Sequence, residues 1–257
     1  MAVGPRLFSK TAWRGTLIAA ALGSATALAW WALYRQQAER NALPMEGMWM
    51  PPTGTWRWAL TDFGLVWSMW LIMMLAMMLP VVAPMVVLIQ RIGRGEQREA
   101  RIRPPAFLAG YFLLWVGFSL FMTLLQWQFH GLRWLTPMMD AQSATVSGAL
   151  LILSGAYQFT PWKTACLSHC RTPLGFLLAQ GRRGGWRLGL HHGLYCVGCC
   201  WAEMLVMFAV GVMNLLWMGL ITLAIVAERY VPGPEGVVRK LVGIGLVTWG
   251  CTQWVGG

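Results

Sequence analysis

Long apolar runs separated by short polar stretches dominate the pattern of this chain. Most runs reach the roughly 20 residues that an α-helix needs to cross the hydrocarbon core of a bilayer. The connections between them are too short to hold a separate globular domain. The pattern therefore predicts an all-α fold, a polytopic transmembrane helix bundle in which residues 1–257 form a single membrane domain. The runs cover residues 16–33, 65–89, 107–127, 144–162, 194–227 and 237–254.

The run at 194–227 is too long for one crossing of a bilayer. Its 34 residues would form a helix about 51 Å long, at 1.5 Å per residue, against a hydrocarbon core of about 30 Å. Either the chain turns near 211–214, or the first turns of the helix lie outside the hydrocarbon. Six and seven spans are therefore both open.

Composition supports the membrane assignment and excludes a nucleic-acid partner. The chain is 57% hydrophobic and 11% charged, which is more apolar surface than a globular core of this size can bury. Its net charge of +11 comes from basic residues dispersed between the apolar runs, where they act as determinants of topology. The 17 tryptophans favour the ends of the runs, as rings at a lipid interface do. The predicted partner of this surface is the lipid bilayer.

The distribution of basic residues predicts the orientation. The N-terminus and the 91–105 and 163–193 loops hold 13 of the 20 basic residues, whereas the 35–63 and 128–143 loops hold four. By the positive-inside rule, the N-terminus and those first two loops are cytoplasmic. Basic residues at 228–240 favour a cytoplasmic position there too, which would require the additional turn near 211–214. The first run follows a basic segment and contains a site like that of a cleaved signal peptide, but its length favours a retained helix.

Five of the six cysteines lie in two clusters. Residues three and four apart share one face of a helix, so each cluster forms a patch of ligand-type side chains. Both clusters are predicted at the same cytoplasmic boundary of the membrane, and thiolate and imidazole groups suit Cu(I) or Zn(II). The alternative is that the cysteines are small buried hydrophobic residues, as we expect for Cys251. The candidate metal ligands are Cys166, His169 and Cys170 in the first patch, Cys196, Cys199, Cys200 and Glu203 in the second, and His191 and His192 just before it.

Glu203 has two interpretations, because an acidic side chain inside a span is costly unless it has a function or a partner. It could complete a metal site, or it could be a structural carboxylate paired with Lys163 or Arg187. In contrast, Glu228 and Arg229 follow the end of a long apolar run and are predicted to be solvated flanks.

A row of methionines in the second run is a weaker indication of metal binding than the cysteine clusters. Met69, Met73 and Met77 recur at four-residue spacing, and Met78 lies beside them. Thioethers bind Cu(I), so this row could be a metal path, although methionine is also a common filler of apolar cores. Pro80 and Pro84 remove backbone donors and are expected to kink the helix, which can free carbonyls to line a cavity.

Three long motifs resemble a known family. They are Trp70-Leu-Ile-Met-Met-Leu-Ala-Met-Met-Leu-Pro80, Tyr157-Gln-Phe-Thr-Pro-Trp-Lys-Thr-Ala-Cys-Leu-Ser-His-Cys-Arg-Thr-Pro173 and Gly193-Leu-Tyr-Cys-Val-Gly-Cys-Cys-Trp201. With them, about residues 65–230 resemble the bacterial predicted metal-binding integral membrane proteins, a domain of unknown function. The resemblance implies a multi-pass protein of the bacterial inner membrane whose five clustered cysteines are motif positions. It implies no substrate or reaction. Trp162, His169 and Glu203 depart from the family pattern.

The leading hypothesis is a membrane protein that binds a soft transition metal for transport or delivery. Cu(I) is favoured and Zn(II) stays open, and the implied partner is a metallochaperone or a cuproprotein assembly factor. One alternative is a membrane thiol–disulfide oxidoreductase that uses Cys196 and Cys199 as its Cys-x-x-Cys pair. Another is a non-catalytic assembly subunit with a structural metal site. The sequence lacks the motifs of ATPases, serine hydrolases and zinc proteases, which favours a role other than catalysis.

Overall fold

The chain folds as a bundle of α-helices. The computed structural model describes residues 6–42, 51–52, 58–92, 103–136, 139, 141–180, 184–231 and 236–256. Within these ranges the extended structure is limited to an isolated bridge between Leu135 and Ala141, so the all-α prediction is confirmed. The helices are α1 (Arg6–Ala42), α2 (Leu60–Ile92), α4 (Pro104–Gly131), α5 (Ala144–Tyr157), α6 (Pro161–Arg171), α7 (Pro173–Gln180), α8 (Gly185–Val210), α9 (Leu215–Tyr230) and α10 (Val237–Gly256).

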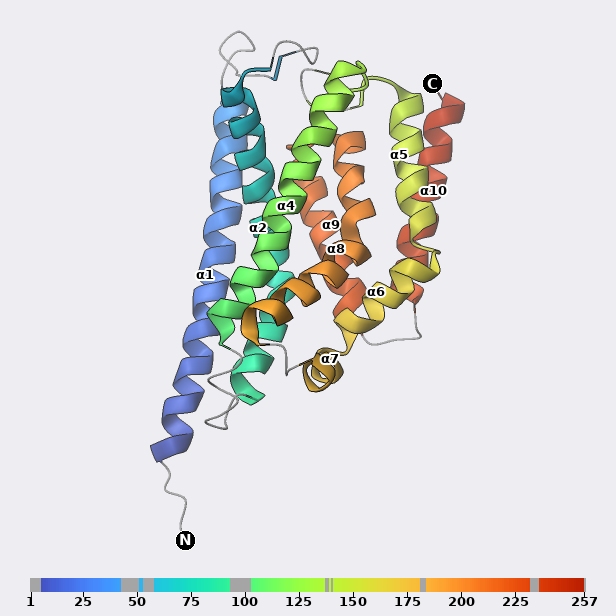
Figure 1. Ribbon diagram of the computed structural model, residues 1–257. Helices are drawn as coiled ribbons and strands as arrows, with labels where there is room; N and C mark the ends of the chain where they lie inside the picture. The colour runs from blue at the N-terminus through green and yellow to red at the C-terminus, as the bar shows by residue number, and fades with distance from the viewer. Residues whose placement is uncertain are drawn as a thin grey trace.

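The long helices run side by side and alternate in direction, and the short helices α6 and α7 lie at the end of the bundle where the chain begins (Figure 1). Among the described residues, four helices are long and apolar enough to cross a membrane, namely α1, α2, α4 and α8. α5 is a shorter apolar helix, and it packs with α10 at the other side of the bundle. This architecture is the predicted transmembrane helix bundle. Most of the 91–105 loop lies outside the described residues.

The long apolar run at 194–227 turns near residues 211–214, which is one of the two alternatives that its length left open. α8 ends at Val210, and Gly211 has a φ of 94°, in the left-handed region that favours glycine. α9 then begins under the cap of Asn214, whose side chain accepts a hydrogen bond from the Trp217 backbone amide at 3.4 Å. The reversal favours the seven-span alternative. It also returns the end of α9 to the end of the bundle where α8 begins (Figure 1).

Pro80 and Pro84 of α2 lie beside α1. Pro80 cannot donate to the carbonyl four residues earlier, which belongs to Ala76. The Trp30 indole N–H of α1 donates to that carbonyl at 3.0 Å. A tryptophan therefore satisfies the backbone group that the proline leaves free.

Helices α4 and α8 approach each other through glycine. A Cβ atom added at Gly110 would overlap the backbone carbonyl of Trp186, and one added at Gly189 would overlap that of Phe107. Small residues permit this close approach of two helix backbones inside a membrane. The contact fixes α8, which carries three of the clustered cysteines.

We expect G110A to destabilise the protein by about 1–3 kcal/mol, because the added methyl group has no room and the two helices must separate. G117A is the matched control, since a Cβ atom at Gly117 of the same helix meets nothing within 4 Å. Thermal unfolding of both variants in detergent measures the difference. Equal midpoints for the two variants would contradict this description of the α4–α8 contact.

Candidate metal centre

The first cysteine cluster lies on α6, a short helix held at the end of the bundle. α6 begins at Pro161, and Thr160 caps it by accepting a hydrogen bond from the Lys163 backbone amide. At its other end, the Arg171 side chain donates to the backbone carbonyl of Glu228 at 2.7 Å. α6 therefore packs on both α8 and the end of α9.

The two cysteine clusters meet where α6 crosses α8. Cys170 is buried and its thiol hydrogen-bonds to the sulfur of Cys199. The sulfur of Cys166 lies 2.8 Å from the position that a Cβ atom would take on Gly198, so a larger residue at 198 would have to displace this sulfur. Burial raises the pKa of the Cys166 thiol above its ordinary value. The structure thus brings together the two segments that the sequence placed at one boundary.

The three cysteines of α8 are buried on one face of the helix. The Cys200 thiol donates to the Cys196 carbonyl at 2.9 Å, and the Cys196 and Cys199 sulfurs lie within hydrogen-bond range of the Cys200 sulfur as alternative acceptors. The Tyr111 hydroxyl of α4 lies 3.0 Å from the Cys196 sulfur. All six cysteines are free thiols. The cluster is therefore a set of reduced sulfurs in pairwise contact.

Arg229 points into this cluster, so the prediction that Glu228 and Arg229 are solvated flanks is wrong. The two side chains are only 2% and 5% exposed. One terminal nitrogen of Arg229 donates to the Cys196 sulfur at 3.0 Å and to the Cys199 sulfur at 2.9 Å. The physical reason is the turn at 211–214, which returns α9 to the depth of the α8 cysteines.

A second buried charge network lies beside the thiols. The Lys163 ammonium is 2.5 Å from Glu203 Oε1 and 2.7 Å from Glu228 Oε2. Gln158 also donates to Glu203 Oε1, at 2.6 Å. Burial would lower the pKa of Lys163, but the two carboxylates raise it above its ordinary value, and the ammonium stays charged. Glu203 is thus a partnered carboxylate, as one of its two interpretations anticipated, and its partner is Lys163.

The three candidate histidines make ring contacts with aromatic side chains, and His192 also lies close enough to Cys199 and Arg229 to interact with them electrostatically. His169 is exposed, its Nδ1 lies 2.9 Å from the Ala165 carbonyl, and its ring stacks on Tyr195 at 4.1 Å. His191 lies between Tyr195 and Phe176. His192 is buried among Phe107, Tyr111 and Phe176.

The sequence predicted two patches of metal ligands, one on each helix, and the structure arranges these side chains differently. Among the described residues, no group of three or more His, Cys, Asp or Glu side chains is arranged to hold one metal ion. The sulfurs of Cys196 and Cys199 share the Arg229 guanidinium and are one pair of adjacent ligand-type atoms. A four-ligand tetrahedral site, which structural Zn(II) requires, is not assembled in this part of the chain.

The methionine row lies in the core of α2. Met69, Met73, Met77 and Met78 are all buried. The neighbouring Trp70 ring lies 5.4 Å from Phe208, near the end of α8 that is remote from the thiols. This placement agrees with core packing, and a role as a metal path stays a prediction.

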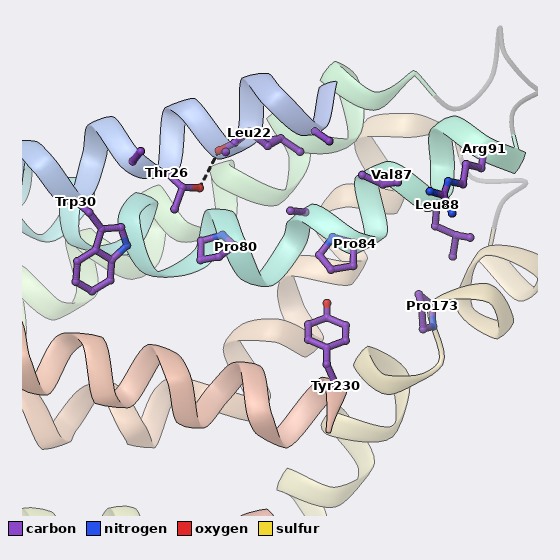
Figure 2. A pocket seen from close by; sticks show the side chains of 14 residues that line it. Leu22, Thr26, Trp30, Pro80, Pro84, Val87, Leu88, Arg91, Pro173 and Tyr230 are labelled. Atoms are coloured by element: carbon purple, nitrogen blue, oxygen red, sulfur yellow. Dashed lines mark hydrogen bonds between the residues drawn. The ribbon is translucent and has the colours of Figure 1, made fainter. Parts of the chain in front are cut away.

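A cavity of about 990 Å³ lies between α1, α2 and the end of α9 (Figure 2). Pro80 and Pro84 face it, with Arg91 at one end. The Tyr230 hydroxyl on its wall donates to the Val81 carbonyl at 2.7 Å. The described residues that line it include no cysteine, histidine or methionine, so none of these residues is a typical ligand of a soft metal ion.

Sequence reasoning missed the role of Arg229, Glu228 and Tyr111 in this site. A count from the predicted turn could have found the first two. The α8 cysteines lie 11–15 residues before Gly211, and Arg229 lies 15 residues after Asn214. With equal rise per residue in both helices, the two groups reach the same level. Tyr111 carries no comparable signal.

Three comparisons with known proteins complete the description of the chain. A family model described as a copper chaperone matches residues 67–253. The matched segment includes both cysteine clusters and the return helix with Arg229. Neither the curated proteins nor the solved structures yield a match to this chain.

Proposed function

This chain belongs to the copper chaperone family whose model matches residues 67–253, and from that premise we propose that it binds Cu(I) within its helix bundle for transport or delivery. The observation that supports this proposal is the junction of α6 and α8, where Cys170 contacts Cys199 beside Cys196 and Arg229. Soft thiolate ligands select Cu(I) over hard cations.

The proposed ligands are the sulfurs of Cys196 and Cys199, with Cys170 and Cys200 within reach for exchange. Pairwise contacts among four thiols give a monovalent ion several alternative partners without a rigid, complete shell. Such an arrangement suits a cargo ion that must leave again. Cys166 lies at the edge of the group, half-buried against Gly198.

The proposed setting is the bacterial inner membrane, with the N-terminus and the thiol junction on the cytoplasmic side. α6 and the lower halves of α8 and α9 lie at the end where the chain begins (Figure 1). The basic loops predicted there favour the cytoplasm. A cytosolic metallochaperone or a cuproprotein assembly factor is then the proposed partner on that side of the membrane.

We expect wild-type protein, purified in detergent under anaerobic and reducing conditions, to bind Cu(I), and a C196S/C199S/C200S variant to lose that copper. Hydroxyl oxygen is a harder and weaker ligand for Cu(I) than thiolate sulfur. Bound copper and zinc are measured by elemental analysis after reconstitution. C251S is the control, since Cys251 is exposed and remote in sequence from both clusters. Equally low copper in wild type and triple variant would end the proposal.

One observation favours a redox function as a second candidate. Arg229 contacts both thiols of the Cys196-x-x-Cys199 pair, and a neighbouring cation activates thiols for exchange. A redox titration with thiol alkylation separates the two functions. A defined, reversible dithiol couple would support the oxidoreductase, whereas thiols that stay reduced and are protected by copper support the chaperone.

A further inference from the structure

Arg229 is a buried cation whose described side-chain partners are two thiols and the Tyr230 hydroxyl, with no carboxylate among them. The other buried cation nearby, Lys163, has carboxylates on both sides at 2.5 and 2.7 Å. In the described part of the chain, Arg229 takes part in none of the ion pairs with an acidic side chain, and its Nε has no hydrogen-bond partner. A buried guanidinium without a counter-ion is costly. The thiol pair is therefore the place where its charge must be balanced.

The charge of a metal complex at this pair depends on the metal. Binding breaks the S–H bonds of Cys196 and Cys199, forms two sulfur–metal bonds and releases the two protons to solvent, with no change of oxidation state. Two thiolates and one monovalent ion carry a net charge of −1, which the guanidinium brings to zero. Counted for these groups alone, a divalent ion with the same two thiolates and guanidinium carries +1, one unit more than the monovalent complex.

We propose that Arg229 is the specificity-determining residue of this site, and that its charge selects monovalent soft cations, Cu(I) and Ag(I), over Zn(II). This inference rests on the proposed function, since it concerns which ion the same thiols accept. The ligand arrangement supports it independently of charge, because among the described residues no group of three or more His, Cys, Asp or Glu side chains is arranged around one point, as tetrahedral Zn(II) requires.

Metal competition in the purified full chain tests the inference. Ag(I) is the probe, because it is monovalent and soft and does not change oxidation state during the measurement, and Zn(II) is the competitor. We expect R229Q to lose Ag(I) affinity on the order of a hundredfold relative to wild type, as loss of one buried charge partner predicts. Zn(II) affinity should stay equal or rise, so that the Ag(I)/Zn(II) preference collapses. R229K keeps the charge and should retain most of the preference.

R239Q is the matched control, since Arg239 is also a buried arginine but donates to the backbone carbonyl of Gln158 and not to a thiol. Its Ag(I)/Zn(II) preference should equal that of wild type. An unchanged preference in R229Q overturns the inference while leaving copper binding intact. If R229Q does not fold, R229K decides. Loss of the Ag(I)/Zn(II) preference in R229K, which keeps the positive charge, would equally overturn the inference. If the wild-type protein binds neither Ag(I) nor Cu(I), the proposed function itself is contradicted.

Discussion

Replacing Lys163 with methionine is expected to lower the free energy of unfolding by about 3–5 kcal/mol, because it leaves two buried carboxylates without their cation. Glu203 and Glu228 are both almost fully buried, and the Lys163 ammonium lies between them. The same network joins α6, α8 and α9. Its loss should therefore loosen the junction that carries the thiols.

Thermal or denaturant unfolding in detergent measures this change. K240M is the matched control, because Lys240 is exposed on α10 and should cost little. The triple variant K163M/E203Q/E228Q removes the unbalanced charge and should recover part of the lost stability. A K163M variant as stable as K240M would show that the triad contributes nothing to the fold.

The second large effect is expected at Cys199. C199S should weaken Cu(I) binding by more than about a hundredfold, which exceeds the loss typical of residues that only support a ligand. Cys199 is the one thiol that contacts Cys170 of the other cluster and also accepts from Arg229 at 2.9 Å. Its sulfur is therefore the point where both cysteine clusters and the buried cation meet.

Competition with a chromogenic Cu(I) chelator under anaerobic conditions measures this affinity. H169A is the comparison, because His169 is exposed and stacks on Tyr195 away from the sulfurs, and it should change the affinity by less than about threefold. The measurement also tests the sequence-based inclusion of His169 among the ligands. A larger loss in H169A than in C199S would place the metal outside the thiol junction.

The apolar pattern of the chain determined the class of the fold. Runs of about 20 apolar residues can form only helices in a bilayer, since each backbone group must be satisfied within its own segment. The excessive length of 194–227 also required a reversal or an overhang, and Gly211 and Asn214 supply the backbone freedom and the cap that the reversal uses. Helical spacing likewise put Cys196, Cys199 and Cys200 on one face before any tertiary contact was known.

Only the tertiary structure decided what surrounds those thiols. Spacing along one helix describes that helix alone, so it could not reveal that α6 crosses at Gly198 or that Tyr111 of α4 reaches Cys196. The environment of Arg229 depended on the same folding. A cation at the end of an apolar run can lie in water or be buried between helices. Arg229 is buried because α9 packs against α6 and α8. Burial depends on how the helices pack together. The position of Arg229 at the end of an apolar run could not show this packing, and the sequence-based prediction therefore placed the residue in solvent.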